Sequence, residues 1–475
     1  MDPNETTVRL GGDASASAFL ARRLQDAAER FPAPFAGLEL PSDASRFRRT
    51  YPDLLADFEA RRAAAPERVE IARAMAADTR AALCFGTAER SVPLSDALNE
   101  PAPPLPLVEE SAARWLGWTP SFVYRGQRHQ GTAIADVAQA LADRALITAP
   151  AAQALRGLLR ERFTDGTVDL RGRSVVALGA GAEMAATRHF LEAGADLLWL
   201  DRVPVPDELR ASGRAGGRLL TTEQPVDLLR RPAEALAAIR HYAGTEGPVD
   251  LCLYAYAPGQ LRELTLTGVM NAIVDALDPS LVASITLLVS PTTPIALTPQ
   301  DVEAITDRHA RRPGWEALLA SIGLLGRGAG HVSAGGGNAI RSVVAIQGAS
   351  YQAAQYLGKV LQAEAWADPA GPSRRVSANT AAITKTRSLD HPVFAAAFGG
   401  AGAFGVETFT PRQSRCLNGL LTVADWLSET LPEPGRVRVH GGIHTLPYPL
   451  EPALRMAATF GFARSPRLLR GLLQR

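Results

Sequence analysis

The sequence predicts an α/β protein with a doubly wound parallel sheet and a mostly helical N-terminal extension. Short apolar runs of strand length alternate with helical segments through residues 170–290, a pattern typical of a parallel sheet. A glycine-rich turn follows the first of these strands, and residues 1–166 show helical periodicity without that alternation. We therefore expect two domains, a helical one at 1–166 and an α/β one at 167–475, with an insert at about 291–348.

Composition excludes several classes of protein. The chain has 475 residues, and 50 Lys and Arg against 49 Asp and Glu leave a net charge of +1, so we expect neither a nucleic-acid nor a membrane partner. The three cysteines, Cys84, Cys252 and Cys416, are scattered singly, which fits a reducing compartment. No apolar run approaches the roughly 20 residues of a spanning helix, and the first ten residues do not resemble a signal peptide. The expected location is cytoplasmic.

The N-terminal 166 residues carry no motif of known chemistry. Leu98–Val108 is proline-rich and must be extended, either as a linker or as an ordered arm across a partner surface. Arg128 and His129 are expected in a solvated polar loop. Apolar spacing and the Thr148 cap predict helices over Tyr51–Ala82, Ile134–Ala145 and Pro150–Phe163.

The glycine-rich turn lies in the layout of a dinucleotide-binding site. The strand Ser174–Leu178 leads into Gly179-Ala180-Gly181-Ala182, then an amphipathic segment, a second strand at Leu197–Leu200, and Asp201. Glycine lets the backbone approach a pyrophosphate, and a helix N-terminus supplies free N–H groups. Asp201, 22 positions after Gly179, is placed to hold an adenosine ribose. The third glycine of the usual pattern is missing, since Met184 and Ala185 stand there.

The cofactor that this layout predicts is NAD or NADP. We expect Gly179, Gly181, Ala182 and Asp201 to contact it. The acid favours NAD, whereas the adjacent Arg202 is suited to receive a 2′-phosphate.

Further strands follow, and their carboxyl ends should meet at one edge of the sheet. Expected strands are Arg218–Thr221, Val249–Ala257 and Leu281–Val289, with helices at Pro232–Tyr242 and Leu261–Leu277. Ligands of such sheets bind outside the carboxyl ends of strands. This placement brings Ser290 and the turn after Val249–Ala257 to the same edge as Gly179 and Asp201.

From these residues on, the chain resembles the short-chain dehydrogenase/reductase superfamily. The resemblance is carried by VDLCLYAYAPG, by Ser290 after the fifth strand, by the Tyr and Lys of ASYQAAQYLGKVLQAEAW, and by RVSANTAAITKTR, which ends near Thr386. A closing helix at Pro411–Ser428 and the segment RVRVHGG, with His440 in place of an acid, follow in the family's order. The resemblance covers about residues 168–445 and implies a Rossmann-type catalytic domain.

The likeness implies roles for individual residues. Tyr351 or Tyr356 would be the catalytic acid, and Ser290 would hydrogen-bond the substrate oxygen. Lys359 would lower the pKa of the tyrosine and hold the nicotinamide ribose, and Thr386 would anchor the nicotinamide amide. The turn residues Ala255, Tyr256 and Ala257 would line the cofactor.

The Tyr–Lys spacing departs from the family pattern. Seven residues separate Tyr351 from Lys359 and two separate Tyr356 from it, where the family has three. Enoyl-carrier-protein reductases in the superfamily use longer gaps, with the tyrosine near the helix start, and Tyr351 resembles that arrangement. The 60 residues between Ser290 and Tyr351, where the family has about a dozen, contain expected helices at Pro299–His309 and Trp315–Leu325 and a flexible Gly326–Gly337. The insert fits either an active-site segment or a subunit interface.

The leading expectation is an NAD(P)-dependent reductase of a carbonyl or enoyl group on a small-molecule or acyl substrate, acting as a homo-oligomer. The alternative is a non-catalytic relative that serves in assembly or regulation. Lys385 is expected to lie on the side of the cofactor phosphates or simply to be exposed. The pair His440 and His444 has metal-like spacing, but the intervening glycines argue against a helix, and no metal is expected.

Overall fold

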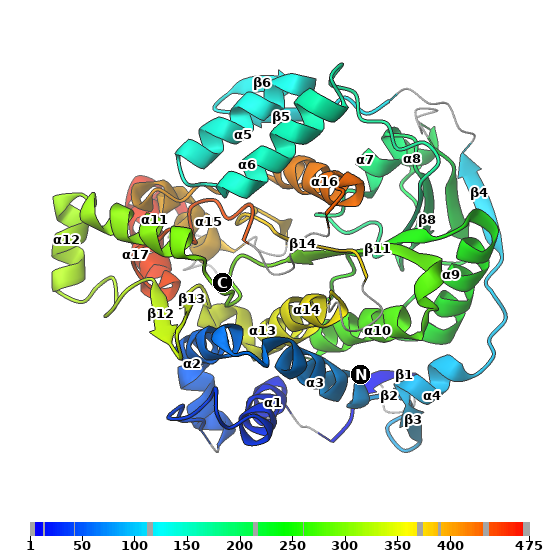
Figure 1. Ribbon diagram of the computed structural model, residues 1–475, viewed down its shortest axis with the longest axis horizontal. Helices are drawn as coiled ribbons and strands as arrows, with labels where there is room; N and C mark the ends of the chain where they lie inside the picture. Colours follow the sequence, from blue (N-terminus) through cyan, green and yellow to red (C-terminus); the bar gives the residue numbers. More distant parts are fainter. Residues whose placement is uncertain are drawn as a thin grey trace.

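A seven-stranded, mostly parallel sheet lies at the centre of this α/β protein (Figure 1). The computed structural model describes residues 5–12, 15–41, 43–111, 117–211, 217–259, 261–367, 374–387, 391–430 and 437–468. The strand order is β14-β11-β10-β7-β8-β9-β4, and only β4 is antiparallel to its neighbour. In chain order the strands are β4 (Leu107–Ser111), β7 (Ser174–Leu178), β8 (Asp196–Leu200), β9 (Leu219–Thr222), β10 (Val249–Leu253), β11 (Val282–Val289) and β14 (Val376–Thr380).

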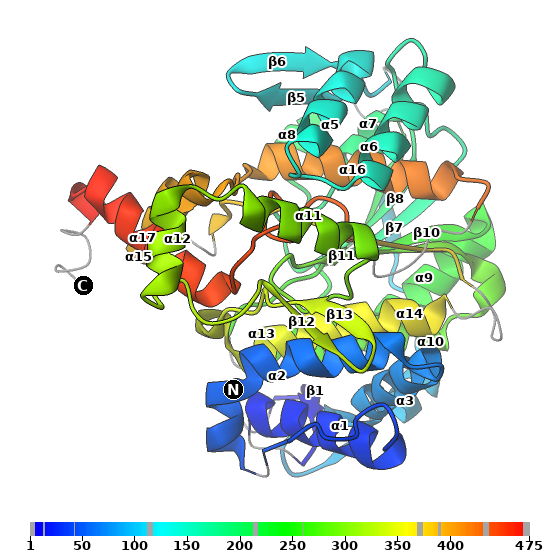
Figure 2. The ribbon, with the colours of Figure 1, turned by 60° about the vertical axis from the view of Figure 1, so that its left-hand side comes forward.

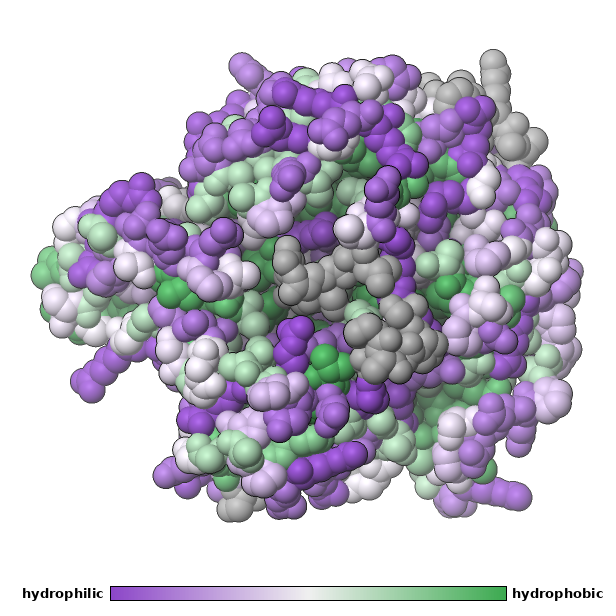
Figure 3. Space-filling view, viewed as in Figure 1, coloured by the Kyte–Doolittle hydropathy of each residue, from purple (hydrophilic) through white to green (hydrophobic). Residues whose placement is uncertain are grey.

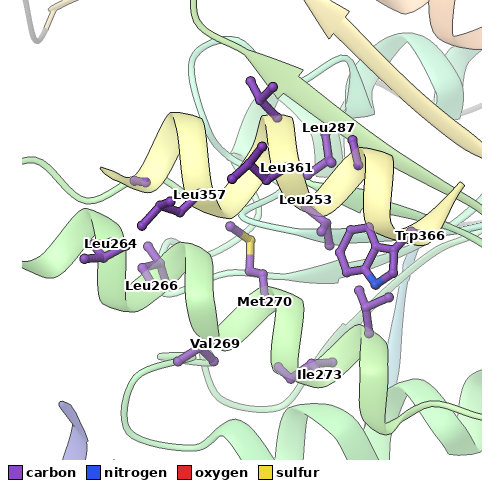
Figure 4. Close-up of a cluster of buried hydrophobic side chains, with 14 of the residues drawn as sticks. Leu253, Leu264, Leu266, Val269, Met270, Ile273, Leu287, Leu357, Leu361 and Trp366 are labelled. Atoms are coloured by element: carbon purple, nitrogen blue, oxygen red, sulfur yellow. The ribbon is translucent and has the colours of Figure 1, made fainter. Parts of the chain in front are cut away.

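The apolar runs of the central strands explain their position. All five residues of β10 are buried, and β7 and β8 bury every residue but the first, as expected for strands covered on both faces. On one face, Leu253 and Leu287 of the sheet pack against side chains of α10 (Arg262–Ala276) and of the helix that runs from α13 through α14, including Met270, Leu357 and Trp366 (Figure 4).

Helices cover both faces of the sheet (Figure 2). One face carries α10 with α13 (Gly348–Gln355), a π-helical turn (Tyr356–Leu361) and α14 (Gln362–Trp366), and the N-terminal helices pack outside them. The same core includes α9 (Pro232–Glu246).

The other face carries α16 (Pro411–Leu427), α5 (Ile134–Asp143) and α6 (Ala149–Arg156), with the short α7 (Thr187–Glu192) and α8 (Asp207–Ala211) at its side. The N-terminal elements of the first face are α1 (Ala16–Arg30), α2 (Ala44–Ala64), α3 (Arg68–Ala81), α4 (Leu94–Asn99) and a small antiparallel sheet of β1 (Thr7–Leu10), β2 (Leu83–Gly86) and β3 (Ser91–Pro93).

The N-terminal residues share their cores with the α/β half. One core joins Phe58 and Ile71 to Leu253, and a second joins Leu141 to Ala177. The proline-rich segment contributes β4, an edge strand of the protein's own sheet. The predicted boundary at 166/167 stays a prediction, although residues on both sides of it pack in the same cores.

Arg128 and His129 differ from their expected loop positions. They lie in β6 (Gln127–Gln130), which pairs with β5 (Ser121–Tyr124). Arg125 and Gly126, with φ of 49° and 79°, form the tight turn between the strands, the conformation that two-residue hairpins prefer.

The insert forms a separate layer beside the carboxyl end of the sheet. It contains α11 (Pro299–Ala310), α12 (Gly314–Ser321) and a hairpin of β12 (His331–Ala334) and β13 (Gly337–Ile340). Part of the segment expected to be flexible, Gly326–Gly337, is thus a hairpin held against α2, where a Cβ on Gly337 would lie 2.2 Å from the Ala60 carbonyl oxygen. Two C-terminal helices, α15 (Pro392–Gly400) and α17 (Leu450–Arg464), pack beside it and cross closely through small residues.

Candidate functional site

The glycine turn after β7 lies against the loop after β10. Gly179 has φ of +83°, and a Cβ there would lie 2.2 Å from the Ala255 Cα. The backbone amides of Tyr254 and Ala255 both donate to the Leu178 carbonyl at 2.8 Å. Gly179 therefore allows two strand ends to meet, in addition to any role toward a ligand.

Asp201, directly after β8, fastens the same turn. Its Oδ2 accepts a hydrogen bond from the Gly181 amide at 2.8 Å, and its Oδ1 accepts one from the Val203 amide at 3.0 Å. Gly181 and Arg202 are exposed and Ala182 is half-buried. The carboxylate that the sequence assigns to a ribose is already bonded to the turn that should face the pyrophosphate.

No helix begins at the glycine turn. The predicted amphipathic segment after Ala182 is helical only over α7, which has six residues and starts at Thr187. The Thr187 hydroxyl donates to the Ala180 carbonyl at 2.7 Å, which closes residues 180–187 into an irregular loop. The free N–H groups of a helix N-terminus are thus absent from the turn Gly179–Ala182.

Tyr351 and Ser290 come together at the end of β11. The hydroxyls of Ser290 and Thr292 are 2.9 Å apart, and both lie close enough to the Tyr351 hydroxyl to lower its pKa. Burial and the charge of Glu263 act in the opposite direction, with burial the largest cause, so the pKa of Tyr351 is raised overall. The side chain of Gln355 orders the strand end, because its Oε1 accepts the Ser290 amide at 2.9 Å.

Lys359 lies in the π-helical turn Tyr356–Leu361 and points into the protein. Its Nζ donates to the Leu288 carbonyl at 2.9 Å, two residues before Ser290. Burial lowers the pKa of Lys359, and the negative charge of Glu263 partly offsets this.

Glu263 completes this cluster, and its role was not expected from the sequence. It lies in the first turn of α10, is buried, and accepts a hydrogen bond at 3.4 Å from Gln355 Nε2. Burial raises the pKa of Glu263 to about 7, against the effects of Lys359 and Gln355. One signal in the sequence points to it: this is a carboxylate in the first turn after Ala257-Pro258-Gly259, in a helix of otherwise mainly apolar and uncharged residues.

Tyr356 lies in a different environment. Its hydroxyl donates to Glu59 Oε2 at 2.7 Å, and its ring packs edge-to-face on Phe58 of α2. Glu59 in turn binds Arg62, whose guanidinium also contacts Glu364 of α14 at 2.8 Å. The structure therefore places Tyr356 in a buried network between α2 and α14, away from Ser290.

The remaining expected cofactor residues are spread along the edge. Tyr256 is exposed, Ala255 is half-buried and Ala257 is buried. Strand β14 ends at Thr380, well before the expected Thr386, which is half-buried and whose amide donates to the Thr384 carbonyl at 2.8 Å.

Lys385 and the histidine pair lie near this edge as well. Lys385 is exposed. His440 and His444 stack with ring centroids 5.3 Å apart, and burial lowers both pKa values, that of His444 to about 4. Within the described ranges, no three metal-ligating side chains gather to hold an ion.

Two cavities lie elsewhere in the molecule. One of about 770 Å³ lies between α6 and the end of α16, with Arg162, Asp425 and Arg438 in its lining. A second of about 530 Å³ shares Arg162 and Leu427 with it. Neither is lined by Tyr351 or Ser290. Polar side chains, and not a cavity, therefore mark the candidate site at the sheet edge.

No family model and no curated protein matches the chain. In the part of the chain that the structure describes, every helix is too short or too polar to cross a membrane.

Proposed function

We propose that this protein is an NAD(P)-dependent oxidoreductase of divergent short-chain type, with a Rossmann-type sheet, that reduces a carbonyl or enoyl group, including one carried as an acyl thioester. The observation that carries the proposal is the meeting of Tyr351 with Ser290, beside buried Lys359 and Glu263, at the carboxyl ends of β10 and β11. A phenol, a hydroxyl and an amine near one another are the groups that stabilise a developing oxyanion.

The strand order supports a dinucleotide at this edge. Numbered along the chain from β7 and without β4, the strands run 3-2-1-4-5-6 across the sheet, the order of dinucleotide-binding doubly wound folds. The order reverses between β7 and β10, where Gly179 meets Ala255. Ligands of open parallel sheets bind at such a switch point.

The residues at the edge fit the cofactor in part. Asp201 keeps lone pairs for a ribose hydroxyl, since a carboxylate offers about four acceptor positions and two are in use. The pyrophosphate would be held by backbone groups of the exposed turn at Gly181 and Ala182, without the help of a helix N-terminus. Lys359, when protonated, has two N–H donors besides the one given to Leu288, which suit the nicotinamide ribose. Bound there, the nicotinamide would supply a hydride.

The chain's own groups would manage the proton. The raised pKa of Tyr351 keeps its phenol protonated at neutral pH, the state that an acid needs, and differs from the lowered value expected from Lys359. Ser290 and Thr292 lie against that phenol. The Thr292 hydroxyl donates to Gln347 Oε1 and accepts the Ser290 proton, so Ser290 would turn this proton from Thr292 to a bound substrate oxygen. Glu263, with a pKa near neutrality, is placed to exchange protons with Lys359 through their shared buried region.

Titration with NADH and NADPH followed by a carbonyl and enoyl substrate panel tests the proposal. Tyr351→Phe should bind the cofactor as the parent does and lose activity by about 100-fold or more, the usual contribution of a positioned acid. Tyr356→Phe is the matched control and should keep turnover, because its hydroxyl contacts Glu59. Full turnover in Tyr351→Phe would remove the assignment of the acid.

The second candidate is a non-catalytic member that retains the fold for assembly or regulation. The bonding of Asp201 to Gly181 favours it, since both groups are then partly engaged without a cofactor. Binding of NADH with no consumption by any panel member would support this candidate over the reductase.

A further inference from the structure

Helix α12 reverses the usual placement of charged and apolar residues. Its one charged residue, Glu316, is 7% exposed. Leu318, within the helix, and Ile322, directly after its end, are each 61% exposed. A surface helix normally buries its leucines and exposes its carboxylates. The outward face of α12 therefore has a role other than contact with the protein's own core.

The inner side of α12 is well anchored. Glu316 lies near Arg308 and Tyr448, and burial raises its pKa while the positive charge of Arg308 lowers it. Trp315 lies at the border between the inner side and the outward face: its ring packs edge-to-face on Phe404 and Phe460, each with centroids 5.5 Å apart, and stays 38% exposed. Leu318 and Ile322 thus belong to a segment that is fixed in place, and no other described residue covers them.

The outward face is apolar over more than two turns. Trp315, Leu318 and Ile322 follow the i, i+3, i+7 spacing of one helix face, and Leu324, 47% exposed, extends it. Residues 314–326 contain no charged side chain other than the buried Glu316. Helix α12 is the outermost element on its side of the molecule, and hydrophobic side chains gather at that edge of the surface (Figures 1 and 3).

Arginines bracket this face at both ends. Arg311 and Arg312 precede α12, and Arg327 follows it. Arg311 is 79% exposed and contacts Asp307 at 3.6 Å, and Arg312 contacts His309. A second copy docked along α12 would bring these arginines together, whether the helices ran parallel or antiparallel. An anionic surface would instead attract the arginines at both ends of α12.

We propose that the α12 face, defined as Trp315, Leu318, Ile322 and Leu324 with Arg311, Arg312 and Arg327, docks on an anionic lipid surface. A convex apolar patch with a half-exposed tryptophan and flanking arginines is the arrangement of an interfacial helix. Such docking is peripheral and agrees with the lack of a spanning helix among the described residues. The net charge of +1 gave no sign of it, because the excess of arginine is local. The proposal does not depend on the reductase assignment.

Co-sedimentation of the full chain with vesicles tests this. The parent should bind phosphatidylglycerol vesicles, bind phosphatidylcholine vesicles at least 10-fold more weakly, and release as salt rises. The double variant Leu318→Glu with Ile322→Glu should bind phosphatidylglycerol at least 10-fold more weakly than the parent. The matched control is the double variant Val92→Glu with Val123→Glu, which changes two exposed apolar residues outside the α12 face. It should bind phosphatidylglycerol vesicles as the parent does.

Several results would overturn the proposal. The proposal fails if the parent does not bind the vesicles. It also fails if the α12 variant binds as well as the parent while both melt at the same temperature, or if the control variant loses as much binding as the α12 variant. If the α12 substitutions instead convert an oligomer to a monomer and the parent ignores vesicles, the face binds a second copy. Gel filtration of the same samples measures this.

Discussion

At the scale of single residues, the buried carboxyl of Glu263 has the most consequence. The side chain lies in a site with Tyr351, Lys359 and Gln355, and its ionisation changes the charge beside the proposed acid. An ionised Glu263 opposes negative charge developing on a substrate oxygen. A protonated Glu263 does not.

Reduction is therefore expected to weaken as the pH rises through about 7, the pKa of Glu263, by at most about tenfold per pH unit. Glu263→Gln stays neutral and should keep its kcat/KM at pH 8 to 9, so that this step disappears. The exposed carboxyl of Glu303 on α11 provides the control, and Glu303→Gln should retain the step. An unchanged step in Glu263→Gln would assign the titration to another group.

The pKa of Tyr351 could not be predicted from the sequence. The expectation that Lys359 lowers it considered only the effect of a nearby positive charge on the phenolate. Burial in the folded protein dominates instead, and the π-helical turn changes the direction in which Lys359 points. Both effects depend on tertiary packing that residue spacing does not report.

At the scale of elements, a buried ionic network joins α2 to the helix of the candidate site. Tyr356, Glu59, Arg62 and Glu364 form it, and the side chains of Glu59 and Arg62 are almost fully buried. Removing one partner of a buried ion pair leaves a charge without compensation.

Arg62→Met should therefore lower the free energy of unfolding by about 3 to 5 kcal/mol, measured by urea denaturation followed by circular dichroism. Arg188→Met removes an exposed i,i+4 pair with Glu192 and is expected to cost less than about 1 kcal/mol. Equal midpoints for the two variants would mean that the network does not hold α2 in place.

The sequence predicted strands more accurately than the segments around glycine. Apolar runs located β7, β8, β10 and β11 to within a few residues, because strands buried on both faces need such runs. Beside the glycine turn, the observed helix α7 is shorter than the expected helix, because Thr187 closes a local loop by its hydrogen bond to Ala180. The role of Glu263 was not predicted, because a single carboxylate in a helix is ordinary unless it is known to be buried.

At the scale of the whole molecule, two buried histidines tie stability to pH. His440 and His444 lie where the C-terminal segment meets the insert, and His444 Nε2 lies 3.3 Å from the Pro291 carbonyl oxygen. Burial lowers both pKa values, and the unfolded chain thus binds more protons than the folded one in mildly acidic solution. This contribution is complete above pH 6.5 and is lost as the pH falls toward 4.

His444→Gln removes one of these groups. Relative to this variant, the parent should lose about 2 to 3 kcal/mol of stability between pH 7.5 and 4.5, calculated for a shift from 6.5 to about 4. The negative charge of Asp301 raises the pKa of His444, and the value of about 4 already includes this effect. A parent–variant difference that does not change with pH would show that His444 is protonated to the same extent in both states.

The packing of the first hundred residues against later ones has a consequence during synthesis. Thr7 bonds to Leu229, Arg80 to Asp275, and α2 packs on Tyr356. At roughly 5 to 20 residues per second, a ribosome needs on the order of 15 to 60 seconds after completing α3 to deliver α14. Through that interval the side chains of α2 and α3 that pack on later segments, such as Phe58 against Tyr356, have no partner. We therefore expect ribosome-bound chains that end after α3 to bind chaperones more strongly than chains that include α14.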